Sequence, residues 1–147
     1  MYIQIVFAVK GRQNFITGNI REETQKYISG IIAANKQKLY AIYCMPDHVH
    51  ILVSIRPDIA ISDLVRNIKA NSSAFIKNKF HTLPSFAWQE GFGAFSYSKS
   101  QSQQVVQYIL KQPGHHKKKT FKEEYISFLE AYAIEFDARY LFEFYDE

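Results

Sequence analysis

The spacing of apolar residues in the first part of the chain predicts a strand, a helix and a hairpin, in that order. Residues 2–9 form an apolar, β-prone run that ends at a polar, turn-like break. Apolar residues then recur at near-helical spacing over 17–37. Two further β-prone runs, 38–44 and 48–55, flank Met45-Pro46-Asp47, where proline favours a tight connection. We expect these two runs to pair as a hairpin.

A second helix and further strands are predicted in the middle of the chain. Ser62 can cap a helix that carries an apolar stripe and runs to about Phe80. Two aromatic segments near 86–88 and 92–97 are separated by glycines, and we interpret them as strands or a hairpin.

The C-terminal part predicts two more helices. Residues 102–112 carry apolar side chains at helical spacing, and Pro113-Gly114 is a strong stop signal. Thr120 and Glu123 then fit a capping box at the start of a fourth helix.

This order of elements predicts the fold class. Strands and helices alternate as in an α+β fold, an antiparallel sheet with helices packed on one face, of ferredoxin-like or RRM-like type. With 147 residues, 47% of them hydrophobic, the chain suits one compact domain over residues 1–147, with 113–147 as a C-terminal helical tail.

Charge is unevenly distributed along the chain. Up to Lys119 there are 16 basic and 6 acidic side chains, net +10, whereas from Thr120 onward there are 2 and 8, net −6. A basic body suggests a polyanionic partner, and a solvated basic surface is the simpler alternative.

Other features restrict the protein class. The chain shows no basic leader followed by an apolar core and a cleavage site, and no apolar run near membrane-spanning length. We therefore expect a cytoplasmic protein without a membrane span. Cys44 is the single cysteine, so a disulfide within the chain and a cysteine zinc cluster are excluded. A metal would need histidine, carboxylate or amide ligands.

The first candidate site is the motif His48-Val49-His50. Alternate residues of a strand point to the same face, so both imidazoles can converge on one metal ion. The alternative is a pair of histidines with a structural role.

The second candidate is Tyr108 with Gln112. Residues four apart lie on one face of a helix. A tyrosine hydroxyl can attack phosphorus, and an amide oxygen can complete a metal site made by two histidines. Alternatively, Tyr108 packs beside Val105 and Ile109.

Together, the two motifs resemble the single-tyrosine HUH transposases of the insertion-sequence 200 type, which are related to the REP-associated tyrosine transposases. HUH denotes histidine, a hydrophobic residue and histidine. The resemblance covers most of residues 1–112. Its segments are Tyr2–Phe7 with Lys10–Arg12, Met45–Val53 as the most specific, Ser62 to Ser73, Trp88–Ser96 and Val105–Gln112.

This resemblance implies a metal-dependent transposase that cleaves and rejoins single-stranded DNA through a 5′-phosphotyrosine intermediate. It implies that Tyr108 is the nucleophile and that His48, His50 and Gln112 bind Mg²⁺ or Mn²⁺. It further implies DNA hairpins at element ends as substrate and a homodimer whose sites can be completed in trans. The residue at position 70 is alanine where many relatives have glycine, and the tail over 113–147 is variable in the family.

Two other functions remain open. The chain could be a domesticated protein that binds single-stranded DNA hairpins without transposition. It could also be a related HUH nickase of replication or relaxation, which would share the same chemistry.

Further residues are candidates for DNA contact. Aromatic side chains such as Phe92, Phe95 and Tyr97 could stack on unpaired bases, with core packing as the simpler interpretation. Basic side chains near the motifs could contact phosphates, although a solvated loop explains several of them equally well. The basic candidates are Lys10, Arg12, Lys69, Lys117, Lys118 and Lys119.

Overall fold

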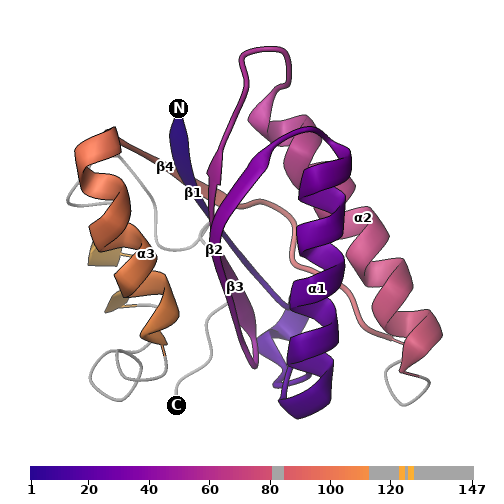
Figure 1. The fold of residues 1–147 in the computed structure, drawn as a ribbon. Helices are drawn as coiled ribbons and strands as arrows, with labels where there is room; N and C mark the ends of the chain where they lie inside the picture. Colours follow the sequence, from indigo (N-terminus) through magenta and orange to yellow (C-terminus); the bar gives the residue numbers. More distant parts are fainter. Residues whose placement is uncertain (81–84, 113–122, 125, 128–147) are drawn as a thin grey trace.

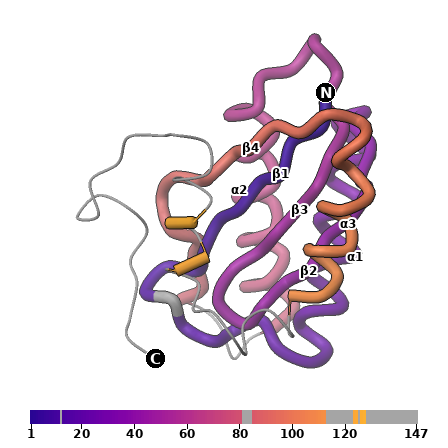
Figure 2. The backbone as a smooth tube through the Cα atoms, turned by 90° about the vertical axis from the view of Figure 1, so that its left-hand side faces the viewer, coloured from indigo at the N-terminus to yellow at the C-terminus, as the bar shows by residue number. Residues whose placement is uncertain are grey.

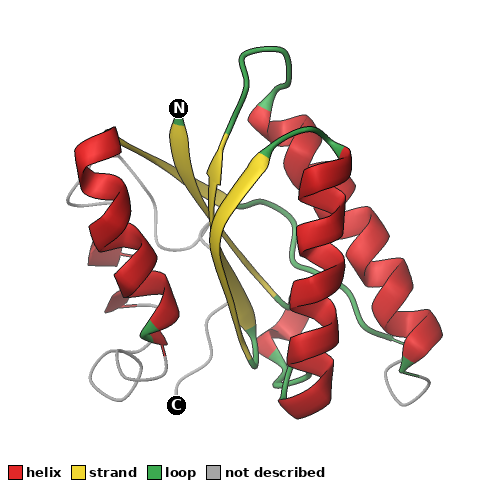
Figure 3. Ribbon diagram, in the orientation of Figure 1, coloured by secondary structure: helices red, strands yellow, loops and turns green. Residues whose placement is uncertain are grey.

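A four-stranded antiparallel sheet forms the centre of the molecule (Figures 1 and 3). The computed structural model describes residues 1–80, 85–112, 123, 124, 126 and 127. The strand order is β2-β3-β1-β4, which places β1 and β3 in the middle. The strands are β1 (Tyr2–Ala8), β2 (Lys38–Met45), β3 (His48–Ser54) and β4 (Gly93–Tyr97).

Over residues 1–80 and 85–112, three helices cover this sheet, and they lie on both of its faces (Figures 1 and 2). The helices α1 (Gly18–Ala34) and α2 (Ile61–Lys79) pack on one face, whereas α3 (Ser102–Leu110) packs on the other. Two short 3-10 turns, η1 (Lys10–Arg12) and η2 (Lys99–Gln101), follow β1 and precede α3. No helix in the described ranges is long and apolar enough to cross a membrane.

The α+β class with an antiparallel sheet is confirmed, and the position of α3 amends the predicted arrangement of the helices. The expectation that all helices share one face holds for α1 and α2. The strand β3 is buried on both faces, and on the second face Ala41 and Leu52 form an apolar patch. Val105 and Ile109 of α3 pack on this patch, which is why α3 lies opposite the other two helices.

Most predicted elements agree with the structure. The hairpin between β2 and β3 turns at Pro46 and Asp47, with Met45 paired to His48. The predicted strand near 86–88 is reduced to an isolated bridge between Val9 and Trp88. The predicted fourth helix lies largely outside the described residues, although 123, 124, 126 and 127 are helical.

The main core fills the space between the sheet and the helices α1 and α2. It combines alternate residues of the central strands with the apolar stripes of both helices, as their burial shows. Phe7 meets Trp88 edge to face at 4.8 Å between ring centroids, and Trp88 donates a hydrogen bond to Ser72 Oγ. Through Trp88, these contacts connect β1 to α2. The packed core thereby gives the opposite face of β1 and β3 a rigid support.

Candidate active site

The two histidines of β3 lie side by side on the face of the sheet that α3 covers. His48 and His50 have exposed fractions of 1% and 0%, and their ring centroids are 5.2 Å apart. The intervening Val49 points to the opposite face and joins the main core. The strand period therefore brings both imidazoles together, as the sequence predicts.

Each imidazole has a polar partner that fixes its orientation. His48 Nδ1 lies 2.6 Å from Asp47 Oδ1, and His50 Nδ1 lies 2.9 Å from Gln4 Oε1. The Gln4 amide nitrogen donates to the Tyr97 hydroxyl at 2.9 Å, so its oxygen faces His50. Because Asp47 Oδ1 and Gln4 Oε1 are acceptors, each Nδ1 is the donor in these pairs, and the Nε2 atoms are the ring nitrogens that could bind a metal ion.

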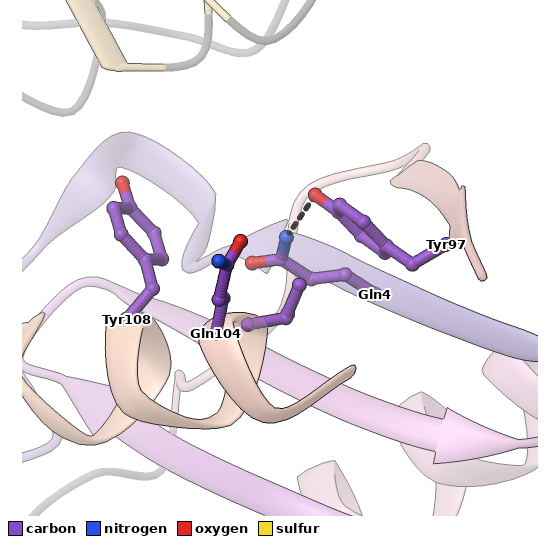
Figure 4. Close-up of a pocket in the computed structure, with 5 residues that line it drawn as sticks. Gln4, Tyr97, Gln104 and Tyr108 are labelled. Carbon is purple, nitrogen blue, oxygen red and sulfur yellow. Dashed lines mark hydrogen bonds between the residues drawn. The ribbon is translucent and has the colours of Figure 1, made fainter. Parts of the chain in front are cut away.

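The helix α3 brings Tyr108 to the same place. Its apolar contacts with β2 and β3 hold the helix across the sheet, and the Tyr108 ring lies 6.2 Å from the His50 ring between centroids. Figure 4 shows Tyr108 projecting from α3 beside Gln104. The proposed nucleophile and the histidine pair thus share one site within one chain.

A residue that the sequence did not single out joins them. Glu124 has an exposed fraction of 3%, and its Oε1 lies 3.0 Å from His50 Nε2. The other carboxylate oxygen accepts a hydrogen bond from the Tyr108 hydroxyl. His48, His50 and Glu124 together offer ligand atoms that all lie within 4.8 Å of one another.

This donor set fits a divalent cation. Two imidazoles and a carboxylate are ligands that Mn²⁺ and related ions accept, and their mutual distances suit one ion between them. His50 Nε2 is buried and finds no hydrogen-bond partner among the described residues, although Glu124 lies close. A buried lone pair costs free energy unless it is satisfied, and a bound cation would satisfy it.

Gln112 also reaches this region. It follows α3 and is fully buried, and its amide lies close enough to the Tyr108 hydroxyl to influence the pKa of that group, although neither amide atom makes a hydrogen bond of good geometry with the described residues. Such an amide is available as a ligand, so the predicted role of Gln112 stays a prediction. The sequence pattern did not indicate that Glu124 lies in the same cluster as the two histidines.

The environment of Tyr108 favours its protonated form in the absence of a cation. Burial raises the pKa of the Tyr108 hydroxyl well above its usual value, and the negative charge and hydrogen bond of Glu124 raise it further. Contact with the Gln112 amide acts in the opposite direction. A reaction in which the Tyr108 oxygen acted as a nucleophile would therefore require removal of this proton.

The predicted DNA contacts are dispersed. Lys69 of α2 donates from Nζ to the carbonyl oxygens of Gln89 and Gly91 at 2.7 Å and 2.5 Å, and burial lowers the pKa of Lys69 to about 8. This ammonium packs over the Phe7 ring, on the face away from the histidines. A phosphate contact by Lys69 stays a prediction, because the observed contacts are structural.

The other basic candidates are less informative. Lys10 lies exposed in η1, and Arg12 ends the same turn. The patch Lys117, Lys118 and Lys119 lies outside the described residues. Their roles stay predictions.

The aromatic candidates have different environments. Phe95 is buried and Phe92 packs against the main core, as expected for core residues. Tyr97 instead lines a pocket of about 250 Å³ between α3 and the sheet, and Tyr108 lines the same pocket at its other end (Figure 4).

The residues that sequence analysis missed carried signals of unequal strength. Gln4 is a polar residue inside an apolar strand, which indicates a buried polar partner. Asp47 directly precedes His48, but its position in a turn explained it equally well. Glu124 is one of eight acidic residues after Lys119, and nothing in the sequence distinguishes it.

Comparison with known proteins identifies the family of this chain. The model of the IS200-like transposase family matches residues 1–112. The ISDra2 transposase TnpA of Deinococcus radiodurans is 26% identical over 113 residues, which are 74% of this chain and 81% of that protein.

Two solved structures share the fold. A crystal structure of a Deinococcus radiodurans R1 protein assigned as a transposase gives a TM-score of 0.64 at 24% identity, covering 76% of this chain and 90% of that one. A REP-associated tyrosine transposase bound to a REP hairpin gives 0.61 at 18% identity, covering 78% and 67%. Since the family model matches residues 1–112, well over half of this chain, the chain belongs to the IS200-like transposase family.

Proposed function

We propose that this transposase cleaves and rejoins single-stranded DNA through a covalent bond between Tyr108 and a 5′-phosphate. The observation that carries the proposal is the convergence of four side chains. The Tyr108 hydroxyl donates a hydrogen bond to Glu124, and Glu124 lies with His48 and His50 in one cluster of ligand atoms.

Each residue of the cluster has a role in this proposal. His48 and His50 would hold a divalent cation, Mg²⁺ or Mn²⁺, through Nε2, with Glu124 or Gln112 as a further ligand. When bound, such an ion neutralises the phosphate and aligns it for in-line attack. Asp47 and Gln4 hold the two imidazoles in the required orientation through Nδ1.

Tyr108 supplies the nucleophile. Its oxygen forms a bond to phosphorus as the bond from phosphorus to the 3′-oxygen breaks, and the released 3′-oxygen takes up a proton. The Glu124 carboxylate already accepts the hydrogen bond of the phenol and is placed to receive its proton. Attack by another 3′-hydroxyl reverses the step, so rejoining needs no nucleotide cofactor.

The proposed substrate is a single strand with a hairpin. A structural neighbour is bound to a REP hairpin, and it shares its fold with 78% of this chain. We further propose that the protein acts as a homodimer on two such strands, in which Tyr108 serves the site of its own chain or completes the partner's site in trans; the 6.2 Å between the Tyr108 and His50 ring centroids within one chain supports the first arrangement.

Formation of a covalent adduct tests the proposal. Labelled single-stranded hairpins from both sides of the gene are incubated with Mn²⁺ and with wild type or the Tyr108→Phe variant. We expect a denaturation-resistant protein–DNA adduct with wild type only, because the substitution removes just the nucleophilic oxygen. Binding of the hairpin should be nearly unchanged.

Other outcomes separate the alternative functions. Salt-sensitive hairpin binding without an adduct would indicate a domesticated binding protein. Nicking without strand joining would indicate a nickase of replication or relaxation. An adduct with Tyr108→Phe would reject Tyr108 as the nucleophile.

A further inference from the structure

We infer that the pocket between α3 and the sheet binds one unstacked nucleobase, from a nucleotide next to the phosphate that Tyr108 attacks. This inference rests on the proposed function and adds a determinant of substrate choice to it. The pocket is lined by Gln4, Tyr97, Gln104, Val105 and Tyr108 (Figure 4).

The position of the pocket ties its occupant to the reacting phosphate. Tyr108 is at once a wall of the pocket and the proposed nucleophile. A second wall, Gln4, is hydrogen-bonded to His50 of the proposed metal site. A group that fills the pocket would therefore lie beside a phosphate attacked by Tyr108, within reach of a nucleotide next to that phosphate.

The lining favours a base over a phosphate or a sugar. Among the described residues that line the pocket there is no lysine or arginine to pair with an anion. Two tyrosine rings and the Val105 side chain provide apolar and aromatic surface instead. Unpaired bases stack on such rings with little dependence on their sequence.

Gln104 adds a group that can read the edge of the base. It is exposed on α3 and projects between Tyr108 and Gln4 in Figure 4. The Gln4 amide is already used by His50 and Tyr97, so the Gln104 amide is the one placed to pair with a ligand. An amide offers a donor and an acceptor together, and a purine whose amino group adjoins N1, as in adenine and 2-aminopurine, presents the complementary pair.

The size of the pocket supports a single base. Its volume of about 250 Å³ is below the ~300–1,000 Å³ typical of sites for drug-sized ligands. One flat ring system fits such a space.

Fluorescence of a base analogue tests the inference without any cleavage. The probe is a ten-nucleotide oligothymidylate with one central 2-aminopurine, titrated into metal-free Tyr108→Phe protein, which keeps the aromatic wall. We expect Gln104→Ala in this background to weaken binding of the probe about tenfold, by analogy with the loss of one base contact. Gln103→Ala is the matched control, since Gln103 is an exposed glutamine of α3 outside the pocket lining, and it should bind as the parent does.

A second measurement uses the hairpin that forms the adduct with wild type. Two variants of this hairpin carry an abasic site, one on each side of the cleaved phosphate. With wild type, one of the two should give a lower adduct yield than the intact hairpin. With Gln104→Ala, that abasic hairpin and the intact hairpin should give the same yield, because the contact to the base is already lost. If Gln104→Ala binds the probe as tightly as Gln103→Ala does, the inference is overturned. Absence of an adduct with wild type would instead reject the proposed function. The two failures can be distinguished, because the fluorescence experiment measures binding and does not depend on cleavage.

Discussion

The two faces of the sheet differ in composition although the same strands supply both. On the face that α1 and α2 cover, β3 contributes Val49, Ile51 and Val53 to an apolar core. On the face that α3 covers, it contributes His48 and His50 to a polar cluster. Both faces are buried, so burial alone does not separate core from site.

The difference lies in how buried groups are satisfied. Apolar side chains need only close packing, which many sequences provide. Buried imidazoles need specific polar partners, and here Asp47 and Gln4 hold one nitrogen of each ring. The polar face is therefore expected to tolerate fewer substitutions than the apolar face.

The largest contrast is expected between neighbouring residues of β3. His50→Ala should abolish the metal-dependent adduct, because it removes a proposed ligand, while the apolar core stays intact. Ile51→Ala should lower the free energy of unfolding by about 2–5 kcal/mol through the cavity that it leaves, and still yield adduct per folded molecule. Denaturant unfolding measures the stability of each variant, and the adduct assay measures its activity. A large loss of stability in His50→Ala with adduct still formed would give His50 a structural role.

The second largest effect is expected at whichever of Glu124 and Gln112 is the further metal ligand. Glu124→Gln keeps the size of the side chain but removes its charge, and Gln112→Leu removes the amide. Loss of a residue that only orients a metal ligand usually weakens metal binding by about 10–100-fold. If Glu124 binds the ion directly, Glu124→Gln should weaken Mn²⁺ binding by more than that. Calorimetric titration with Mn²⁺ measures this; a larger loss in Gln112→Leu would assign the position to Gln112 instead.

Gln4 should have an intermediate effect. Gln4→Ala removes the acceptor that orients His50, so Mn²⁺ affinity and adduct yield should fall by about 10–100-fold. Gln4→Glu restores an acceptor oxygen for His50 Nδ1 and should recover part of the affinity. Equal Mn²⁺ affinity in wild type and Gln4→Ala would remove Gln4 from the site.

The smallest effect is expected on the apolar face, at Lys69. Burial lowers the pKa of Lys69 to about 8, whereas in the unfolded chain it is near the usual value of about 10.4. Between these values the unfolded chain binds more protons, so this group makes the protein more stable as pH rises through that window. Lys69→Met should flatten that rise in a series of denaturant unfolding curves from pH 7 to 10.

Adduct yield per folded molecule should be unchanged in Lys69→Met, since the ammonium contacts Gln89 and Gly91 away from the histidines. A selective loss of hairpin binding in this variant would show that Lys69 contacts a phosphate, as the sequence suggests.

The sequence by itself determined the elements and their local faces. The strand period placed His48 and His50 together, and the turn at Pro46 and Asp47 set where β3 begins. Helical spacing likewise put the apolar residues Val105 and Ile109 on one side of α3. These features follow from local geometry, which the order of residues fixes.

Only the tertiary structure decided which side chains meet. Gln4 reaches His50 because β1 pairs with β3 in the register that sets Val6 opposite His50, although the two residues are 46 positions apart. The face that α3 covers depended on the small apolar patch of Ala41 and Leu52. Glu124 reached the site through chain packing that no local pattern encodes. Contacts between distant residues depend on strand register and on packing of whole elements, because the free energy that selects them is shared across the entire core.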